Sequence, residues 1–176
     1  MTRKTSVYTR VLRLIEKARS VVADYAEGHN SDSRRKANEL LEAHGVKVNQ
    51  ADLSVPSILA PGIAGSRRLT LSSRLSHSGK TYILLHEAGH VLAGDADEPA
   101  QLHFQGALPE GETVADLFAL SEIINPVEAE GGEELVRGLI YKRVDIDDRG
   151  WKRYRVKRLA PMVIDIRARL ENGRSP

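Results

Sequence analysis

The sequence predicts an α+β domain that is mainly helical, with a small sheet between residues 46 and 71. Three observations predict this class. Apolar residues recur at helical spacing in several segments, turn residues and short apolar runs fill the stretch 53–73, and the composition is ordinary for a globular protein. We expect one compact domain with an N-terminal helical segment (1–45), a core (46–130) and a basic C-terminal segment (131–176).

The N-terminal segment predicts two helices. In residues 6–26 apolar side chains return every three or four positions, and Gly28-His29-Asn30 ends this first helix. Ser31 or Ser33 can cap the second helix. Gly45 follows it, at a place where a left-handed residue is expected to stop the helix.

The core begins with short strands. Val46-Lys47-Val48 is predicted as the first strand, and Ile58-Leu59 and Leu69-Thr70-Leu71 as edge strands. Prolines and glycines in the stretch 53–73 exclude a helix there. We expect this sheet to pack against the helix that follows.

That helix is predicted from Thr81 to about Gly94, and it is apolar on nearly every side, which is typical of a buried core helix. An acidic loop over 95–111 separates it from a second buried helix over 113–124. Asn125-Pro126 ends the second helix.

The C-terminal segment is less regular. We predict a helix over 133–143 and a turn over 147–150. The segment 151–170 is compatible with a helix, a strand or both around Pro161.

Composition restricts the kinds of site. The chain has no cysteine, which excludes disulfides and thiolate zinc sites, so any metal must be held by imidazole and carboxylate groups. Charged residues recur from Arg3 onwards, which argues against a signal peptide, and no window is apolar enough to span a membrane. These features predict a soluble cytoplasmic protein.

Charge is unevenly distributed along the chain. No Lys or Arg occurs over 81–136, which is an acidic block that suits a divalent cation or a basic substrate. Downstream, the basic run from Trp151 to Arg158 contains interleaved aromatic residues, a weak signal for nucleic acid. We favour a solvated face or a patch for an acidic partner.

The buried helix 81–94 carries a metal-binding pattern, His86-Glu87-Ala88-Gly89-His90. Histidines four positions apart lie one above the other on a helix and can hold one ion. Glu87, between them, can act as general base toward the attacking water without binding the metal. Three ionisable groups in an apolar helix are costly unless a cation is present.

A third protein ligand is required. The extended pattern with a further histidine fails, because Ala93 and Ala96 occupy the positions it needs. Glu112 on the next helix can be the ligand, while Asp116 one turn later accepts the outer N–H of a ligating histidine. From spacing alone, Glu110 and His103 remain alternatives to Glu112.

These motifs resemble the ImmA/IrrE family of zinc metallopeptidases. The family pairs His-Glu-x-x-His with a downstream Glu-x-x-Ala-Asn/Asp-x-Phe-Ala segment and a following Pro, and the resemblance covers roughly residues 69–126. It implies a zincin-like fold and Glu112 as the third zinc ligand. Ile124-Asn125 departs from the Leu-Met common before that Pro, and the tail beyond it is not matched, which leaves specificity undefined. The matching residues are Leu69–Leu71, His86–His90, Glu112–Ala119 and Ile123–Pro126.

Two residues are candidates for stabilising the transition state. Tyr82 lies one turn before His86 on the same face, and His103 lies in the acidic loop. For Tyr82 the alternative is a tyrosine that simply caps a core helix.

The predicted function is zinc-dependent endopeptidase hydrolysis of an intracellular protein. Because some members of the family act on DNA-binding repressors, the resemblance suggests a transcriptional repressor or regulator as the substrate. The alternative is a zinc-stabilised regulatory or interaction module with little turnover, associated with nucleic acid through its basic tail.

Overall fold

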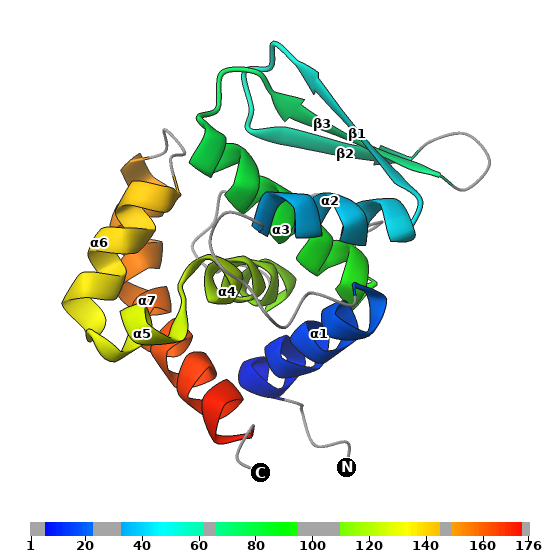
Figure 1. The fold of residues 1–176 in the computed structure, drawn as a ribbon. Helices are drawn as coiled ribbons and strands as arrows, with labels where there is room; N and C mark the ends of the chain where they lie inside the picture. Colours follow the sequence, from blue (N-terminus) through cyan, green and yellow to red (C-terminus); the bar gives the residue numbers. More distant parts are fainter. Residues whose placement is uncertain (1–5, 23–32, 62–65, 95–109, 145–148, 174–176) are drawn as a thin grey trace.

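A computed structural model describes residues 6–22, 33–61, 66–94, 110–144 and 149–173. Within these ranges the chain forms seven helices and a three-stranded sheet, which confirms an α+β architecture that is mainly helical (Figure 1). In chain order the elements are α1 (Val7–Val21), α2 (Ser33–Ala43), β1 (Val46–Ala51), β2 (Ser57–Pro61), β3 (Arg67–Ser72), α3 (His77–Ala93), α4 (Glu110–Ile123), α5 (Pro126–Glu130), α6 (Glu133–Arg143) and α7 (Arg149–Asn172).

The sheet has the strand order β1-β3-β2. β3 pairs in parallel with β1 and antiparallel with β2. The prediction that Leu69–Leu71 forms an edge strand is therefore wrong, because β3 is the central strand. Flanking turn residues suggested an edge, but Leu69 and Leu71 are both fully buried, as expected for a strand that is paired on both sides.

The sheet lies over helices α2 and α3 (Figure 1). Strand β1 contacts α2, whereas β3 contacts α3, so the expected packing of the sheet on the helix around residue 86 is present through β3. Gly45, with φ of 73°, makes the left-handed turn from α2 into β1, as predicted.

Helix α4 lies at the centre of the helical layer, with α1, α3 and α7 in contact with it (Figure 1). Every residue from Thr113 to Ser121 is buried. The helix starts at Glu110, three residues before the predicted start, so Glu112 is within its first turn. Helix α3 also starts earlier than predicted, where the Ser76 hydroxyl accepts a hydrogen bond from the Gly79 backbone N–H (3.1 Å).

The C-terminal half shows two further differences from the prediction. The ambiguous segment 151–170 is a single helix, α7, that continues through Pro161. Pro161 is exposed, so its ring faces solvent. Residues 149 and 150 belong to this helix instead of the expected turn, and the rest of that turn lies outside the described residues. The short helix α5 was not predicted.

Acidic residues of the central block pair with arginines from other parts of the chain. Glu110 contacts Arg10 of α1 at 3.0 Å, and Glu133 pairs with Arg137 within α6. The block that is uniformly negative along the sequence is therefore partly neutralised in the fold.

Glu128 and Arg143 connect the end of α4, the start of α5 and the end of α6. Glu128 and Asn125 form a reciprocal cap at the start of α5, with N–H to oxygen distances of 2.9 and 3.0 Å. Arg143, at the end of α6, contacts Glu128 at 2.5 Å and donates to the Ile123 carbonyl that ends α4. The same guanidinium thus stabilises one helix start and one helix end.

Among the described residues, none of the helices combines the length and the apolar character needed to cross a bilayer.

The Glu128 contact predicts a pH dependence of stability. Hydrogen bonds from Arg143 hold the pKa of Glu128 below its usual range, with partial burial acting in the opposite direction. A carboxylate with a depressed folded-state pKa contributes stability that is fully present above its unfolded pKa, about 4.3, and is lost as the pH falls through the folded value. In urea unfolding, Glu128→Gln should have a lower free energy of unfolding than wild type at pH 7, and this difference should become smaller toward pH 3. Glu16→Gln, at an exposed position of α1, should stay close to the wild-type curve. A gap for Glu128→Gln that is constant with pH would contradict this role.

Candidate metal centre

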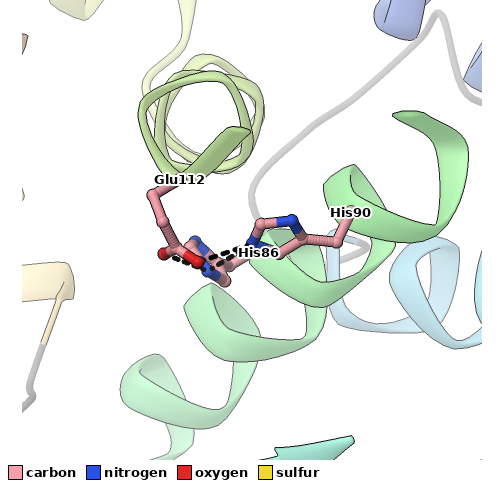
Figure 2. Close-up of side chains that lie close together, drawn as sticks. All are labelled: His86, His90 and Glu112. Atoms are coloured by element: carbon pink, nitrogen blue, oxygen red, sulfur yellow. Dashed lines mark hydrogen bonds and ion pairs between the residues drawn. The ribbon is translucent and has the colours of Figure 1, made fainter. Parts of the chain in front are cut away.

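Two helices bring together the three predicted metal ligands. Helix α3 places His86 and His90 one turn apart, with their Nε2 atoms 3.2 Å from each other. From the first turn of α4, one carboxylate oxygen of Glu112 lies 3.4 Å from His86 Nε2, and the other lies 3.3 Å from His90 Nε2 (Figure 2).

The 3.2 Å between the two Nε2 atoms is close to the spacing of neighbouring donors around a small tetrahedral metal ion. Ligand bonds of about 2.0–2.1 Å at tetrahedral angles put neighbouring donor atoms about 3.3–3.4 Å apart. The three side chains could hold one ion and retain only 12%, 14% and 19% of their exposure, in the order His86, His90, Glu112. Three protein ligands leave a fourth position for water or substrate, which is the arrangement of catalytic sites.

A proton on His86 and a metal ion compete for the same group of side chains. Burial acts to lower the pKa of His86, but contacts with Asp116 and Glu112 and the charge of Glu87 raise it to about 10. Burial acts to raise the pKa of Glu112, and the two histidines hold it far below its usual range. A metal that binds here must displace a proton from His86, so lower pH weakens binding.

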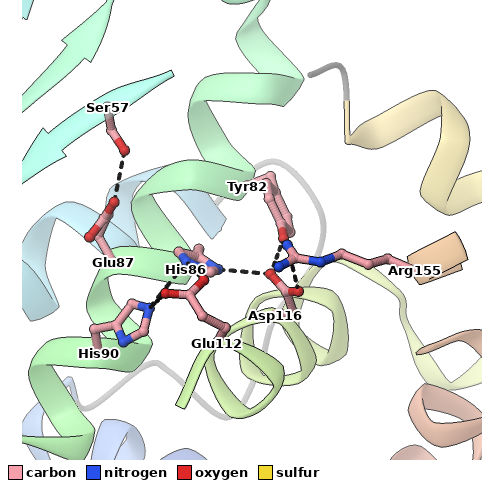
Figure 3. Close-up of polar contacts among 8 residues, drawn as sticks. All are labelled: Ser57, Tyr82, His86, Glu87, His90, Glu112, Asp116 and Arg155. Carbon is pink, nitrogen blue, oxygen red and sulfur yellow. Dashed lines mark hydrogen bonds and ion pairs between the residues drawn. The ribbon is translucent and has the colours of Figure 1, made fainter. Parts of the chain in front are cut away.

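Asp116, one turn after Glu112, is completely buried beneath the metal ligands. Its Oδ1 lies 2.9 Å from Nδ1 of His86, outside linear hydrogen-bond geometry, and accepts a hydrogen bond from the Tyr82 hydroxyl at 2.5 Å. The carboxylate therefore faces the ring nitrogen of His86 opposite to the proposed metal donor (Figure 3). This is the position from which an outer partner fixes the tautomer of a ligating histidine.

Arg155 of α7 completes this group, although it was not predicted as a residue of the site. Its Nη1 lies 3.2 Å from Oδ2 of Asp116, and its side chain is only 13% exposed. It belongs to the basic run that was expected to be a solvated face. Lys157 and Arg158 of the same run are indeed exposed, and the side chains of 152–154 lie outside the described residues.

Tyr82 and His103 were the candidates for stabilising a transition state. Tyr82 is only 1% exposed, and its hydroxyl donates to Asp116. Strong burial and the nearby Asp116 raise its pKa well above the usual value, so the hydroxyl keeps its proton. Tyr82 thus belongs to the buried polar group below the ligands. His103 lies outside the described residues.

Glu87 points toward the sheet. Its Oε1 accepts a hydrogen bond of 2.8 Å from the Ser57 hydroxyl at the first residue of β2 (Figure 3). Ser57 was not predicted, since a lone serine in a turn-rich stretch carries no signal. Glu110, the alternative ligand, instead contacts Arg10 and is not part of the donor cluster in the described residues.

Gly89 allows α3 and α4 to approach closely. A Cβ atom at this position would lie 3.0 Å from the Cα of Ala115 and 3.3 Å from both the Ala115 side chain and the Phe118 ring. The absence of a side chain at Gly89 therefore sets how near Glu112 comes to the two histidines.

Searches with this chain against protein-family models, curated proteins and solved structures give no match.

The donor geometry predicts one metal ion per chain, lost when Glu112 is removed. In protein purified without affinity metals, elemental analysis should find one equivalent in wild type and in Glu110→Ala, but much less in Glu112→Ala. Added metal at 100 times its dissociation constant should stabilise the folded wild type by about 2.7 kcal/mol. Metal content that follows Glu110 in place of Glu112 would contradict the ligand assignment.

The close approach at Gly89 predicts opposite outcomes for two alanine substitutions in helices. At Gly138 of α6 a Cβ meets nothing within 4 Å, so Gly138→Ala should gain the intrinsic helix preference of about 1 kcal/mol. Gly89→Ala has the same intrinsic gain but must displace the backbone of α4, and overpacking costs about 1–3 kcal/mol. Chemical denaturation should rank Gly89→Ala well below Gly138→Ala, with weaker metal binding. Equal gains in stability for the two variants would show that α3 and α4 can accommodate a methyl group at Gly89.

Proposed function

We propose that this protein is a zinc-dependent endopeptidase of the ImmA/IrrE type, with a zincin-like arrangement of α3, α4 and the sheet. His86, His90 and Glu112 would hold zinc, and Glu87 would be the general base. The observation that carries the proposal is the cluster of His86, His90 and Glu112, whose two Nε2 atoms lie 3.2 Å apart and each contact one oxygen of the same carboxylate, at 3.4 and 3.3 Å, while Glu87 is not part of the cluster.

Zinc is the metal that this donor set favours. Two imidazoles, one carboxylate and an open fourth position are a recurring set in zinc hydrolases, and the chain has no thiolate to favour softer metals. When bound, zinc supplies a polarised scissile carbonyl and a more acidic water.

Glu87 would move the proton. It follows His86 directly on α3, its charge acts on the His86 ring, and it does not belong to the cluster of three donors. The Ser57 hydroxyl fixes Oε1 and leaves Oε2 as the acceptor for a proton of the attacking water. The same carboxyl group then returns this proton to the amine that leaves when the peptide bond breaks.

The proposed substrate is a regulatory protein of the same cell, with a DNA-binding repressor as the leading class, and the proposed location is the cytoplasm. Support comes from the resemblance of the segments around His86 and Glu112 to a family in which some members act on repressors. Pairing of Glu110, Glu128 and Glu133 with arginines weakens the case for electrostatic attraction of a basic substrate.

Glu87→Gln separates catalysis from metal binding. The variant should retain wild-type zinc content and thermal stability but lose at least about 100-fold in peptide hydrolysis, since general acid–base catalysis contributes about 10²–10⁴-fold. Glu110→Gln is the matched control and should keep activity. Hydrolysis that survives in Glu87→Gln would remove this residue from the mechanism.

The substrate is identified by comparing proteomes of cells that express wild type or Glu87→Gln at equal level, followed by reconstitution with each protein that disappears. Cleavage of one or a few regulators supports the proposal, whereas broad degradation contradicts the specificity. Zinc binding without any cleavage would favour the alternative, a zinc-stabilised module. Salt-dependent retention on DNA would then indicate that exposed basic residues such as Lys157 and Arg158 contact nucleic acid.

A further inference from the structure

Arg155 reaches the metal centre from a part of the chain far from both ligand motifs. It lies on α7, and its Nη1 contacts Oδ2 of Asp116 at 3.2 Å (Figure 3). Val156 and Leu159, its neighbours on α7, are buried in the common core and fix the helix against α4. The position of the guanidinium is thus determined by packing, with little freedom left to its largely buried side chain.

The two oxygens of Asp116 serve different elements. Oδ1 faces α3, where it receives the Tyr82 hydroxyl and lies 2.9 Å from His86 Nδ1. Oδ2 faces α7 and Arg155. The contact at Oδ2 is an ion pair outside hydrogen-bond geometry. Because this ion pair opposes rotation of the carboxylate, the orientation of Oδ1 toward His86 depends on Arg155.

Arg155 also balances the negative charge of the carboxylates around the site. A divalent ion among these ligands adds two positive charges, while Glu87, Glu112 and Asp116 carry three negative ones. Arg155 supplies the third positive charge, from the side opposite to the metal. Without it, Asp116, which is fully buried, would keep only the neutral Tyr82 hydroxyl and the ring of a metal-bound His86 as neighbours, an expensive state for a carboxylate.

We propose that Arg155 is a positioning residue of the metal centre, which acts through Asp116 on His86 and so sets metal affinity and geometry. The inference rests on the proposed metal-dependent function. It makes α7 part of the site, although α7 contributes no metal ligand.

Arg155→Met and Arg155→Lys test this, with Arg158→Met, an exposed arginine on the same helix, as the control for loss of charge. Zinc affinity is measured by competition with a chromophoric chelator, and geometry by the visible spectrum of the cobalt-loaded protein. Arg155→Met should lower zinc affinity about 10–100-fold, the usual effect of losing an outer partner, and change the cobalt bands. Arg155→Lys should recover part of the affinity, and Arg158→Met should match wild type.

A double variant identifies the route. In an Asp116→Asn background, Arg155→Met should cause little further loss of zinc affinity, because the two residues act in series. If Arg155→Met lowers only the melting temperature of the metal-free protein, with zinc affinity and cobalt bands unchanged, Arg155 is merely structural and the proposal fails. If Arg155→Met does not fold, wild-type affinity and bands in Arg155→Lys would overturn it equally. Absence of zinc binding by wild type would instead refute the proposed function itself, before any variant is compared.

Discussion

Helices α3 and α4 touch at Gly89 and Ala115 with no side chain between them, and the geometry of the metal centre depends on this contact. The histidines belong to α3 and Glu112 to α4, so the distance between the helix axes determines the distance between ligands. Metal–ligand bonds of about 2.0–2.1 Å tolerate little error, and one added methyl group at Gly89 would come within 3.0 Å of the Ala115 backbone and displace α4 slightly. Two small residues without any coordinating atom therefore have as strict a role as the ligands.

The second requirement is a set of buried charges that must neutralise one another. Asp116 is fully buried, and an isolated carboxylate would be strongly unfavourable there. Tyr82, His86 and Arg155 surround it from two other helices. Polar contacts of this kind have strict geometry. They therefore define the relative positions of α3, α4 and α7 more closely than apolar packing alone.

Much of this was accessible from the sequence, for reasons that can be named. Apolar spacing predicted α1 and α2, whereas α3 was predicted because it is apolar on nearly every side. The pentad His86–His90 predicted two of the donors, since ligand spacing on a helix is a local property. Spacing left Glu110 and His103 open beside Glu112, and the family resemblance favoured Glu112. Strand order could not be obtained in this way: whether Leu69–Leu71 is central or at an edge depends on partners distant in the chain. Arg155 and Ser57 were not predicted for the same reason, because neither has a local sequence signal. Only the fold brings Arg155 to Asp116 and Ser57 to Glu87.

The position of Arg155 in chain order has a consequence for biosynthesis. On the ribosome, α3 and α4 emerge before α7, so a growing chain has its histidines and Glu112 in solution while Asp116 still lacks its guanidinium. If α7 sets metal affinity, the nascent chain passes through a stage in which the ligands exist but bind metal weakly. A chain made in this order would reach its full affinity for metal only after α7 has packed against α4.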